Sequence, residues 1–258
     1  MKRRNKLFWV FFVIFVIAIG MGAGYYFGQK DREQVYEDLA KETTKSQEET
    51  KQEENSEEAL TEETPKVEIP VDFTALKEKN PEIYAWIRIP DTAVDYPVLQ
   101  RPSDDVYYLN HTIDGSEGLP GSIYTESVNG QDFTDKNTVL YGHNMKDGTM
   151  FGGLKSYMDE SYMGAHPQIF IYTPEHIFTY QVFGAVTYDN RHILNAFDFN
   201  TDEGFQQYLD SLKEVRNMAS YVKSDVEVTT ADRIITLSTC NGNGDQRFLV
   251  EAVLVNEE

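Results

Sequence analysis

The sequence has very little cysteine, since Cys240 is the only one in 258 residues. A single cysteine forms no disulfide within the chain, so the fold does not depend on the cross-linked framework of small exported proteins. In an exported chain, an odd thiol is reactive, bonded to another molecule or buried in the core. The residues around Cys240 therefore decide which of these roles it has.

Basic residues are also scarce. The chain has 23 Lys and Arg residues against 43 Asp and Glu residues, which gives a net charge of −20. Nucleic-acid binding requires clustered Lys and Arg side chains that neutralise phosphates, so we expect no nucleic-acid partner. Phosphate loops are excluded as well, because no Gly-Lys-Ser/Thr sequence follows the glycines at Gly142, Gly148, Gly152 and Gly153.

Apolar residues are almost absent after Leu39 in residues 29–68. This stretch holds 14 acidic and 6 basic side chains and shows no sustained heptad. Its composition cannot bury a core. We therefore predict an acidic, solvated stalk over residues 29–68, disordered or partly helical, that ends near Pro65 and Pro70.

The N-terminus contrasts with the stalk. Residues 1–6 are basic, and residues 7–28 contain an uncharged run from Leu7 to Phe27 that is long enough to cross a membrane. Because the basic cluster precedes this run, the positive-inside rule places residues 1–6 in the cytoplasm and the rest of the chain outside. A cleaved signal peptide is the alternative, but the run is long for one and offers a poor cleavage site.

Residues 69–258 are long enough for one folded domain with a substantial core. Short helices are predicted at residues 73–79 and 150–157 and a longer one at 205–219. Many short apolar segments predict a mostly β-fold with helical insertions, either a barrel or a sandwich. The predicted strands cover residues 83–89, 94–99, 122–124, 137–141, 168–172, 176–188, 233–239 and 247–255.

Two residues with reactive side chains, Cys240 and His143, lie at or just beyond the ends of predicted strands. Cys240 ends the run Ile234–Cys240, and His143 comes two residues after the run that ends at Tyr141. Arg247 begins the strand that returns from the Cys240 loop, so a hairpin would bring it near the thiol. A thiolate nucleophile, a histidine that protonates the leaving amine and a cation for the oxyanion together provide acyl-transfer chemistry.

Alternatives exist for each of these residues. A lone histidine is more often structural than catalytic, yet His143 has the placement that the remaining histidines lack. For Cys240, the alternative role is that of a buried core residue. The other histidines of the chain are His111, His166, His176 and His192.

The segment Thr236-Leu237-Ser238-Thr239-Cys240, followed by Arg247 and preceded far upstream by Leu140-Tyr141-Gly142-His143-Asn144, resembles the sortase family. Class B sortases are the most similar. The resemblance extends over residues 70–255 and includes Trp86-Ile87-Arg88-Ile89-Pro90, Asp95-Tyr96-Pro97-Val98 and Gly121-Ser122-Ile123-Tyr124. The helix predicted at residues 205–219 agrees with the long helix of class B, and a membrane anchor with a stalk is also typical of sortases.

This resemblance implies an eight-stranded β-barrel that acts as a transpeptidase on the outer face of a Gram-positive membrane. Cys240 would attack the bond after threonine in a C-terminal sorting signal of the LPxTG or NPxTN kind. An amine of a cell-wall precursor would then resolve the thioacyl enzyme. His143 would be the general acid and base, and Arg247 would stabilise the oxyanion or position the signal.

The resemblance also implies substrate-binding residues at Ser238, Tyr141 and Thr239, for which strand packing is the alternative role. The loop from Asn241 to Gln246 is shorter than is common in the family. The sequence offers no calcium site of the class A kind, and we expect neither a metal nor a cofactor.

Two other functions remain open from sequence alone. A cysteine peptidase would use the same residues but release the acyl group to water, although papain-like enzymes place the cysteine before the histidine. A membrane-tethered β-domain that binds wall polymer without catalysis would instead bury its cysteine. These alternatives differ in the reactivity of the native thiol and in the product formed.

Overall fold

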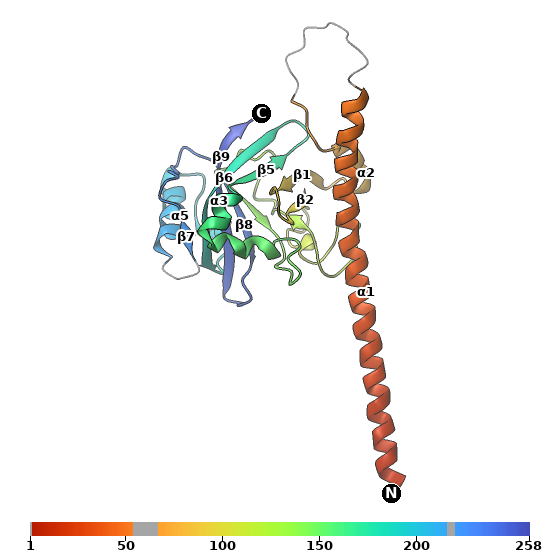
Figure 1. Ribbon diagram of the computed structural model, residues 1–258. Coiled ribbons are helices and arrows are strands. Elements are labelled where there is room, and N and C mark those ends of the chain that lie inside the picture. The colour runs from red at the N-terminus through yellow and green to blue at the C-terminus, as the bar shows by residue number, and fades with distance from the viewer. Residues whose placement is uncertain (1, 54–66, 216–219) are drawn as a thin grey trace.

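The computed structural model describes residues 2–53, 67–215 and 220–258, and side chains within α1 from Phe11 to Lys41 (Figure 1). The helical elements are α1 (Lys2–Glu53), α2 (Phe73–Lys79), η2 (Tyr107–Leu109), η3 (Gly152–Met158), α3 (Glu160–Ala165), α4 (Ile193–Ala196) and α5 (Asp202–Glu214). The strands are β1 (Ile83–Arg88), β2 (Asp95–Leu99), β3 (Ile123–Tyr124), β4 (Asn137–Tyr141), β5 (Gln168–Tyr172), β6 (Ile177–Asp189), β7 (Tyr221–Val222), β8 (Ile234–Cys240) and β9 (Gln246–Glu257).

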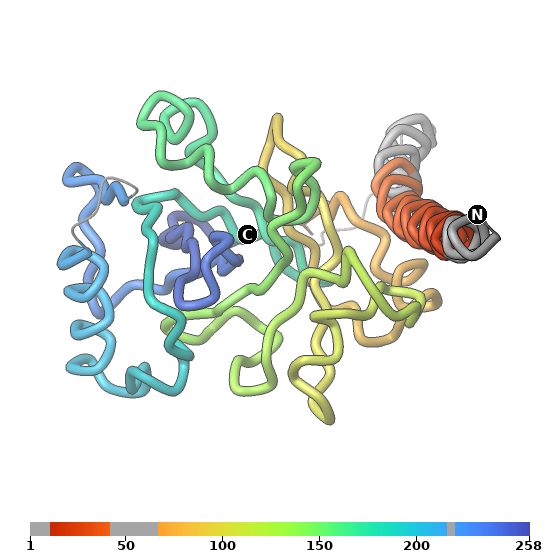
Figure 2. The backbone as a smooth tube through the Cα atoms, turned by 90° about the horizontal axis from the view of Figure 1, so that it is seen from below, coloured from red at the N-terminus to blue at the C-terminus, as the bar shows by residue number. Residues whose placement is uncertain are grey.

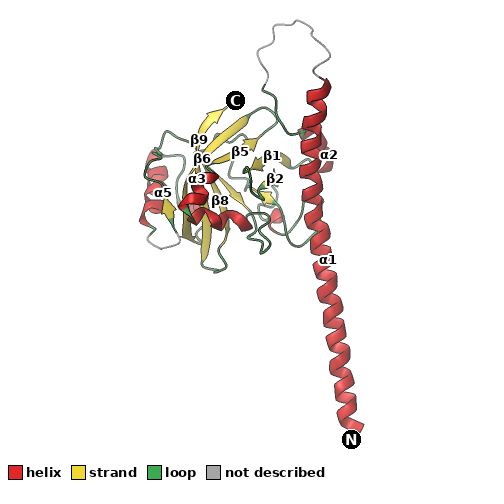
Figure 3. Ribbon diagram, in the orientation of Figure 1, coloured by secondary structure: helices red, strands yellow, loops and turns green. Residues whose placement is uncertain are grey.

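The strands form a closed barrel (Figure 3). Their order is β5-β1-β2-β3-β4-β8-β9-β6, and a further pairing of β5 with β6 closes the ring, while β7 adds to the outer edge of β6. Two neighbouring pairs, β2–β3 and β4–β8, are parallel, and the other pairs are antiparallel. The prediction of an eight-stranded barrel with helical insertions is confirmed.

Alternation along the strands gives the barrel an inner and an outer core. Leu140 of β4 belongs to the main interior cluster, whereas its neighbour Val139 packs into a second cluster beneath α5. Because side chains of a strand point alternately to opposite faces, Tyr141 shares the outward face of Val139. The outer face of β4, which α5 covers at Val139, therefore also carries Tyr141 at the C-terminal end of the strand.

The α5 helix begins earlier and ends earlier than the sequence predicts. Thr201 caps its N-terminus by accepting a hydrogen bond from the Gly204 N–H at 3.1 Å, which starts the helix three residues before Phe205. The helix ends at Glu214, and residues 216–219 of the predicted helix lie outside the described residues. Its apolar stripe is buried against the barrel, with Phe205, Tyr208, Leu209 and Leu212 fully covered.

Other local differences concern short helices. The segment predicted as a helix at residues 150–157 is instead a 3₁₀-helix, η3, and Met150, which has a positive φ of 52°, lies outside it. The α3 helix was not predicted, although Asp159 caps it by accepting hydrogen bonds from Ser161 and Tyr162. The α2 helix matches its prediction and ends before Pro81, as the residue preceding a proline disfavours helix.

The α1 helix runs from the apolar N-terminal segment into the acidic stretch without a break and lies along one side of the barrel (Figures 1 and 2). The stretch expected as a solvated stalk is helical as far as Glu53 and contacts the domain. Tyr36 is 4% exposed and Leu39 is 2% exposed. The Arg32 Nε atom donates a hydrogen bond to the Leu119 carbonyl at 2.6 Å. Residues 54–66 of the expected stalk lie outside the described residues.

Candidate active site

The parallel pairing of β4 with β8 brings the two predicted reactive residues to one edge of the barrel. Tyr141 pairs with Ser238. Because the two strands are parallel, His143 and Cys240 each lie two residues further along in the same direction. Residues two apart on a strand share a face, so the histidine and the thiol follow their strands on the same outer face. The register thus joins two segments that are about a hundred residues apart in the sequence.

Arg247 comes to the same edge from the other side. In the antiparallel β8–β9 pair, Arg247 lies directly opposite Cys240. Directly opposed residues of an antiparallel pair project to the same face. His143, Cys240 and Arg247 therefore lie in one row across three neighbouring chain segments. Cys240 is a free cysteine and is exposed, while Arg247 and His143 are half-buried.

Three hydrogen bonds fix the ends of β4 and β8 to each other. The Gly142 N–H donates to the Ser238 carbonyl at 3.2 Å, which continues the ladder beyond Tyr141. The Thr239 hydroxyl donates to the Gly142 carbonyl at 2.7 Å. The Asn144 side-chain amide donates to the Cys240 carbonyl at 2.7 Å. These bonds hold the backbone on both sides of His143 against the strand that carries the thiol.

Gly142 is the residue that this close approach requires. A Cβ atom at this position would lie 2.5 Å from Ile123 Cδ1 and 2.7 Å from Phe151 Cδ2, which are both buried. The Phe151 N–H in turn donates to the His143 carbonyl at 2.9 Å. The glycine next to His143 therefore lets the histidine backbone pack directly on the core of the barrel.

The His143 ring is held by a main-chain acceptor. Its Nε2 atom lies 2.5 Å from the carbonyl oxygen of Leu109, in η2. A carbonyl only accepts hydrogen bonds, so Nε2 carries a proton in this arrangement. In the neutral ring, the Nδ1 atom is then the one with a free lone pair.

The row of residues opens into a pocket of about 350 Å³. Tyr141 and Ser238 lie in it side by side, and Thr239 also contributes to its lining. The ring of Tyr124 stacks on Tyr141 at a centroid distance of 5.4 Å. Burial raises the pKa of both phenols above their ordinary value, so each remains a hydrogen-bond donor at neutral pH. All six predicted site residues line this pocket.

Two side-chain contacts that were not predicted from the sequence, His192 with Glu126 and Arg191 with Asp189, complete the wall of the pocket. The His192 Nε2 atom lies 2.6 Å from the Glu126 carboxylate, so the segment after β3 is joined to the segment after β6. Burial raises the pKa of Glu126, and His192 partly offsets that effect. Arg191 pairs with Asp189 at 2.5 Å, and this contact holds the pKa of Asp189 below its usual value.

These residues carried no sequence signal because neither pair is close to Cys240 or His143 in the chain. The sheet order β3-β4-β8-β9-β6 brings the chain segments after β3 and β6 to the same pocket as the ends of β4 and β8. A charged residue in a loop is usually solvated, and sequence gives no reason to single out Glu126 or His192 from the other loop carboxylates and histidines.

Ser238 and Thr239 differ in their environments. Both are buried near the C-terminal end of β8, and Ser238 faces the pocket beside Tyr141. The Thr239 hydroxyl is engaged with the Gly142 carbonyl. Side-chain alternation places Thr239 on the opposite face of β8 from Ser238 and Cys240.

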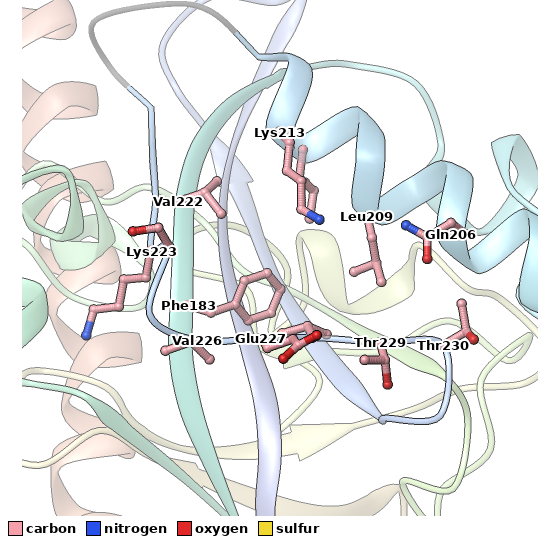
Figure 4. A pocket seen from close by; sticks show the side chains of 13 residues that line it. Phe183, Gln206, Leu209, Lys213, Val222, Lys223, Val226, Glu227, Thr229 and Thr230 are labelled. Atoms are coloured by element: carbon pink, nitrogen blue, oxygen red, sulfur yellow. The ribbon is translucent and has the colours of Figure 1, made fainter.

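A second pocket, with a volume of about 500 Å³, lies between α5, β6 and the chain that joins β7 to β8 (Figure 4). Phe183 and Leu209 contribute its apolar surface, and Lys213 and Lys223 lie at its rim. None of the described residues that line it is a cysteine or a histidine. The larger pocket is therefore not the one with the reactive groups.

Comparison with known proteins agrees with this geometry. The sortase domain matches residues 87–255, which span the barrel from β1 to β9 and include Cys240, His143 and Arg247. The chain belongs to the sortase family. Its relatives include the sortase B of Listeria monocytogenes, 37% identical over 187 residues that cover 70% of this chain and 73% of the relative. The sortase B of Staphylococcus aureus is 36% identical over 168 residues, covering 65% and 67% of the two chains.

Solved sortase structures have the same fold. A Staphylococcus aureus sortase B–substrate complex superposes with a TM-score of 0.71 at 28% identity and covers 88% of this chain and 97% of its own. A sortase B from Bacillus anthracis, in complex with a compound named AAEK1, gives a TM-score of 0.70 at 30% identity, covering 90% and 99%. The resemblance to class B sortases is confirmed, and this sortase is accordingly a cysteine transpeptidase.

Proposed function

We propose that this sortase uses Cys240 as its nucleophile, with His143 as general acid and base and Arg247 as the cation that stabilises the oxyanion. The observation that carries this proposal is the single row in which the ends of β4, β8 and β9 present these three residues within one pocket. The thiol is exposed at the end of a strand whose other residues are buried, which suits a group that must reach a substrate.

The reaction then follows in two steps. The Cys240 thiolate attacks the carbonyl carbon of the threonine in the sorting signal, and the carbonyl oxygen takes the negative charge beside the Arg247 guanidinium. His143 gives a proton to the departing amine as the C–N bond breaks, which leaves a thioester on Cys240. An acceptor amine next attacks the thioester and gives its proton to His143, and the C–S bond breaks to restore the thiolate.

The peptide is placed by the pocket that runs over the outer face of β4 and β8. Tyr141 and Ser238 project to this face and are suited to contact the sorting signal. Thr239 is suited to another task, because its hydroxyl bonds to the Gly142 carbonyl. We assign Thr239 to the alignment of β4 with β8.

The cellular placement follows from α1. The stretch Phe11–Lys41 contains a segment that is apolar and long enough to cross a membrane, and its large apolar side chains are exposed to solvent. With the basic N-terminus in the cytoplasm, the barrel lies outside the cell. The turn between β8 and β9 lies at the lower end of the barrel in Figure 1, the end toward which the apolar half of α1 extends. The catalytic end therefore faces the membrane, where an amine of a membrane-attached wall precursor would be met.

The test is the intact mass of the full-length protein in detergent after incubation with NPxTN-type and LPxTG-type peptides, with and without a diamino acceptor. We expect an acyl adduct on the wild-type protein, none on Cys240→Ala, and an amine-linked product only when the acceptor is present. A product that always carries a free carboxylate would establish a peptidase. No adduct with any peptide, together with a native thiol inert to alkylation, would refute catalysis at Cys240.

The topology is tested with the same single thiol. A membrane-impermeant maleimide added to intact cells should label Cys240, and a Cys240→Ala control should remain unlabelled. Labelling that appears only after the cells are lysed would place the barrel in the cytoplasm and contradict the proposed orientation.

A further inference from the structure

We propose that Tyr36, on the part of α1 that lies against the barrel, is a positioning residue for His143. This inference rests on the proposed function, because it takes Cys240 and His143 as the reacting pair. It adds a role for α1 beyond anchoring: docking of the helix on the barrel sets the geometry of the catalytic histidine. Two separate sets of contacts lead from Tyr36 to the neighbourhood of His143.

The contact of Tyr36 with the barrel is buried and specific. Its hydroxyl donates a hydrogen bond to the Gly121 carbonyl at 2.5 Å and lies 2.9 Å from the Ser122 hydroxyl. The Ser122 hydroxyl also lies 2.9 Å from the carbonyl oxygen of His111. Burying a phenol is favourable only when its hydroxyl finds partners, so these bonds fix where α1 lies along the loop before β3.

The first route passes through the main chain of η2. Gly121 packs so closely on this helix that a Cβ atom there would lie 2.6 Å from the Leu109 carbonyl oxygen. The N–H of Ser122 donates to the Tyr108 carbonyl at 2.9 Å. The Leu109 carbonyl is the group that accepts the hydrogen bond from His143 Nε2. A shift of Gly121 would therefore move the acceptor that orients the imidazole.

The second route passes through the loop that follows His143. The Tyr36 ring lies edge-on to the Tyr96 ring at a centroid distance of 5.7 Å. The Tyr96 hydroxyl accepts a hydrogen bond from the Met150 N–H at 3.0 Å. Met150 forms a β-bridge with Asn144, whose side chain bonds to the Cys240 carbonyl. Contacts of Tyr36 therefore lead in two directions. One set leads to the Leu109 carbonyl, which accepts the hydrogen bond from the imidazole, and the other leads to Asn144, whose side chain bonds to the Cys240 carbonyl.

Neighbouring contacts keep α1 in this place. Arg32 bonds to the Leu119 carbonyl, and its guanidinium packs over Gly118. Leu39 is buried one helical turn beyond Tyr36, on the same face of the helix. These residues hold α1 against the barrel, whereas Tyr36 makes the contacts that lead toward His143.

Loss of the Tyr36 hydroxyl would leave the Gly121 carbonyl and the Ser122 hydroxyl without that partner in a buried place. The loop would adjust to regain hydrogen bonds, and the Leu109 carbonyl would move with it. Reactions that depend on proton transfer between positioned groups lose rate steeply with small displacements. The expected effect is therefore on the reaction of the thiol and on kcat, with peptide binding largely preserved.

The experiment compares full-length protein in detergent with Tyr36→Phe, Ser122→Ala, the double variant and a control, Gln34→Ala. Gln34 is exposed on the same helix. One readout, the pH profile of Cys240 alkylation by iodoacetamide, needs no peptide, and the other is kcat and KM with the peptide found to be turned over. We expect Tyr36→Phe to shift the alkylation profile and lower kcat about three- to ten-fold, with KM within about two-fold of wild type.

Because Tyr36 and Ser122 act through one contact, the double variant should lose less than the product of the two single effects. Gln34→Ala should match wild type in both readouts. The proposal is overturned if Tyr36→Phe and Ser122→Ala lower only the melting temperature and leave the pH profile and kcat at the values of Gln34→Ala. If no peptide reacts with the wild-type protein, the proposed function fails, and the alkylation profiles still decide whether Tyr36 positions His143.

Discussion

Cys240 and Arg247 face each other across the β8–β9 hairpin as directly paired residues. Only six residues separate them. The Asn241 side chain bonds to Gln246, the first residue of β9, at 2.9 Å, and Lys155 bonds to the Asn241 carbonyl at 2.7 Å. A short turn cannot carry the two strands apart, so the backbone of Arg247 stays next to that of Cys240. The hairpin therefore sets how far the proposed nucleophile lies from the proposed cation.

This pairing predicts a graded response at Arg247. Arg247→Lys keeps the positive charge but removes the rigid fork of N–H donors, and we expect kcat/KM to fall about ten- to a hundred-fold. Arg247→Ala removes the charge as well, and the loss should reach about a hundred- to a thousand-fold. Steady-state kinetics with the sorting-signal peptide measures both.

The control for Arg247 is Arg233→Lys near the other end of β8, where the arginine pairs with Glu257 instead of facing the pocket. It should leave kcat/KM within about two-fold of wild type, because a surface ion pair contributes little. Equal kinetics for Arg247→Ala and wild type would remove Arg247 from the mechanism.

The close packing at Gly142 predicts a large effect from one methyl group. Gly142→Ala places a Cβ atom within 2.7 Å of Ile123 and Phe151 side chains, so the segment before His143 must shift. We expect a loss of about 1–3 kcal/mol in the free energy of unfolding and at least a ten-fold loss in kcat. Urea unfolding and kinetics on the same preparation separate the two effects.

Gly244→Ala is the matched control, because nothing lies within 4 Å of a Cβ atom there, although Gly244 belongs to the turn between Cys240 and Arg247. It should behave as wild type in both assays. A Gly142→Ala protein with unchanged kcat would show that the histidine tolerates displacement of its backbone.

Thr239 provides a prediction about strand alignment. Thr239→Val is close in shape but removes the hydrogen bond to the Gly142 carbonyl, and we expect stability to fall by about 1–2 kcal/mol and kcat by several-fold. Thr239→Ser keeps the hydroxyl and should retain most of both. If Thr239→Val raises KM alone, the residue contacts the peptide, and the alignment role assigned to it is wrong.

The strand pattern predicted a mostly β-fold, barrel or sandwich, with Cys240 and His143 at strand ends, because alternation and the lone cysteine are local signals. The choice of an eight-stranded barrel came from the resemblance to sortases. The parallel register of β4 and β8, which places the two residues in one row, is a long-range property that no local pattern encodes. The same reason applies to the pair Glu126–His192, whose partners meet only through the long-range order of the strands.

The contact of α1 with the barrel was missed for a different reason. Residues 29–68 are rich in charge, and that average composition conceals a short apolar stripe made by Tyr36 and Leu39, with Val35 and Ala40 packed beside them. These two buried residues on one helical face, together with the hydrogen bonds of Arg32 and Tyr36, dock the helix on the barrel. Composition alone predicts solvation in such a case, and the spacing of the few apolar residues is the better signal.

A buried carboxyl beneath α5 predicts how stability depends on pH. Glu251 of β9 accepts hydrogen bonds from Tyr208 at 2.8 Å and from Thr236 at 2.9 Å, and burial raises the pKa of Glu251 to about 8. The folded state thus binds this proton more tightly than the unfolded state, in which a glutamate titrates near 4.5. The stabilisation is complete below about pH 4.5 and is lost as the pH rises toward 8.

We therefore expect the free energy of unfolding to fall by an amount on the order of 2–4 kcal/mol between pH 5 and pH 8.5, and Glu251→Gln to abolish most of this fall. Urea unfolding at a series of pH values measures it. The five histidines are common to both proteins, so the difference between the two curves isolates Glu251. Carboxyl groups with lowered pKa values, such as those of Asp114 and Asp189, change their protonation at pH values below this range. Parallel curves for the wild type and Glu251→Gln would mean that Glu251 is ionised in the folded barrel, and that its contacts with Tyr208 and Thr236 compensate for the burial of the charge.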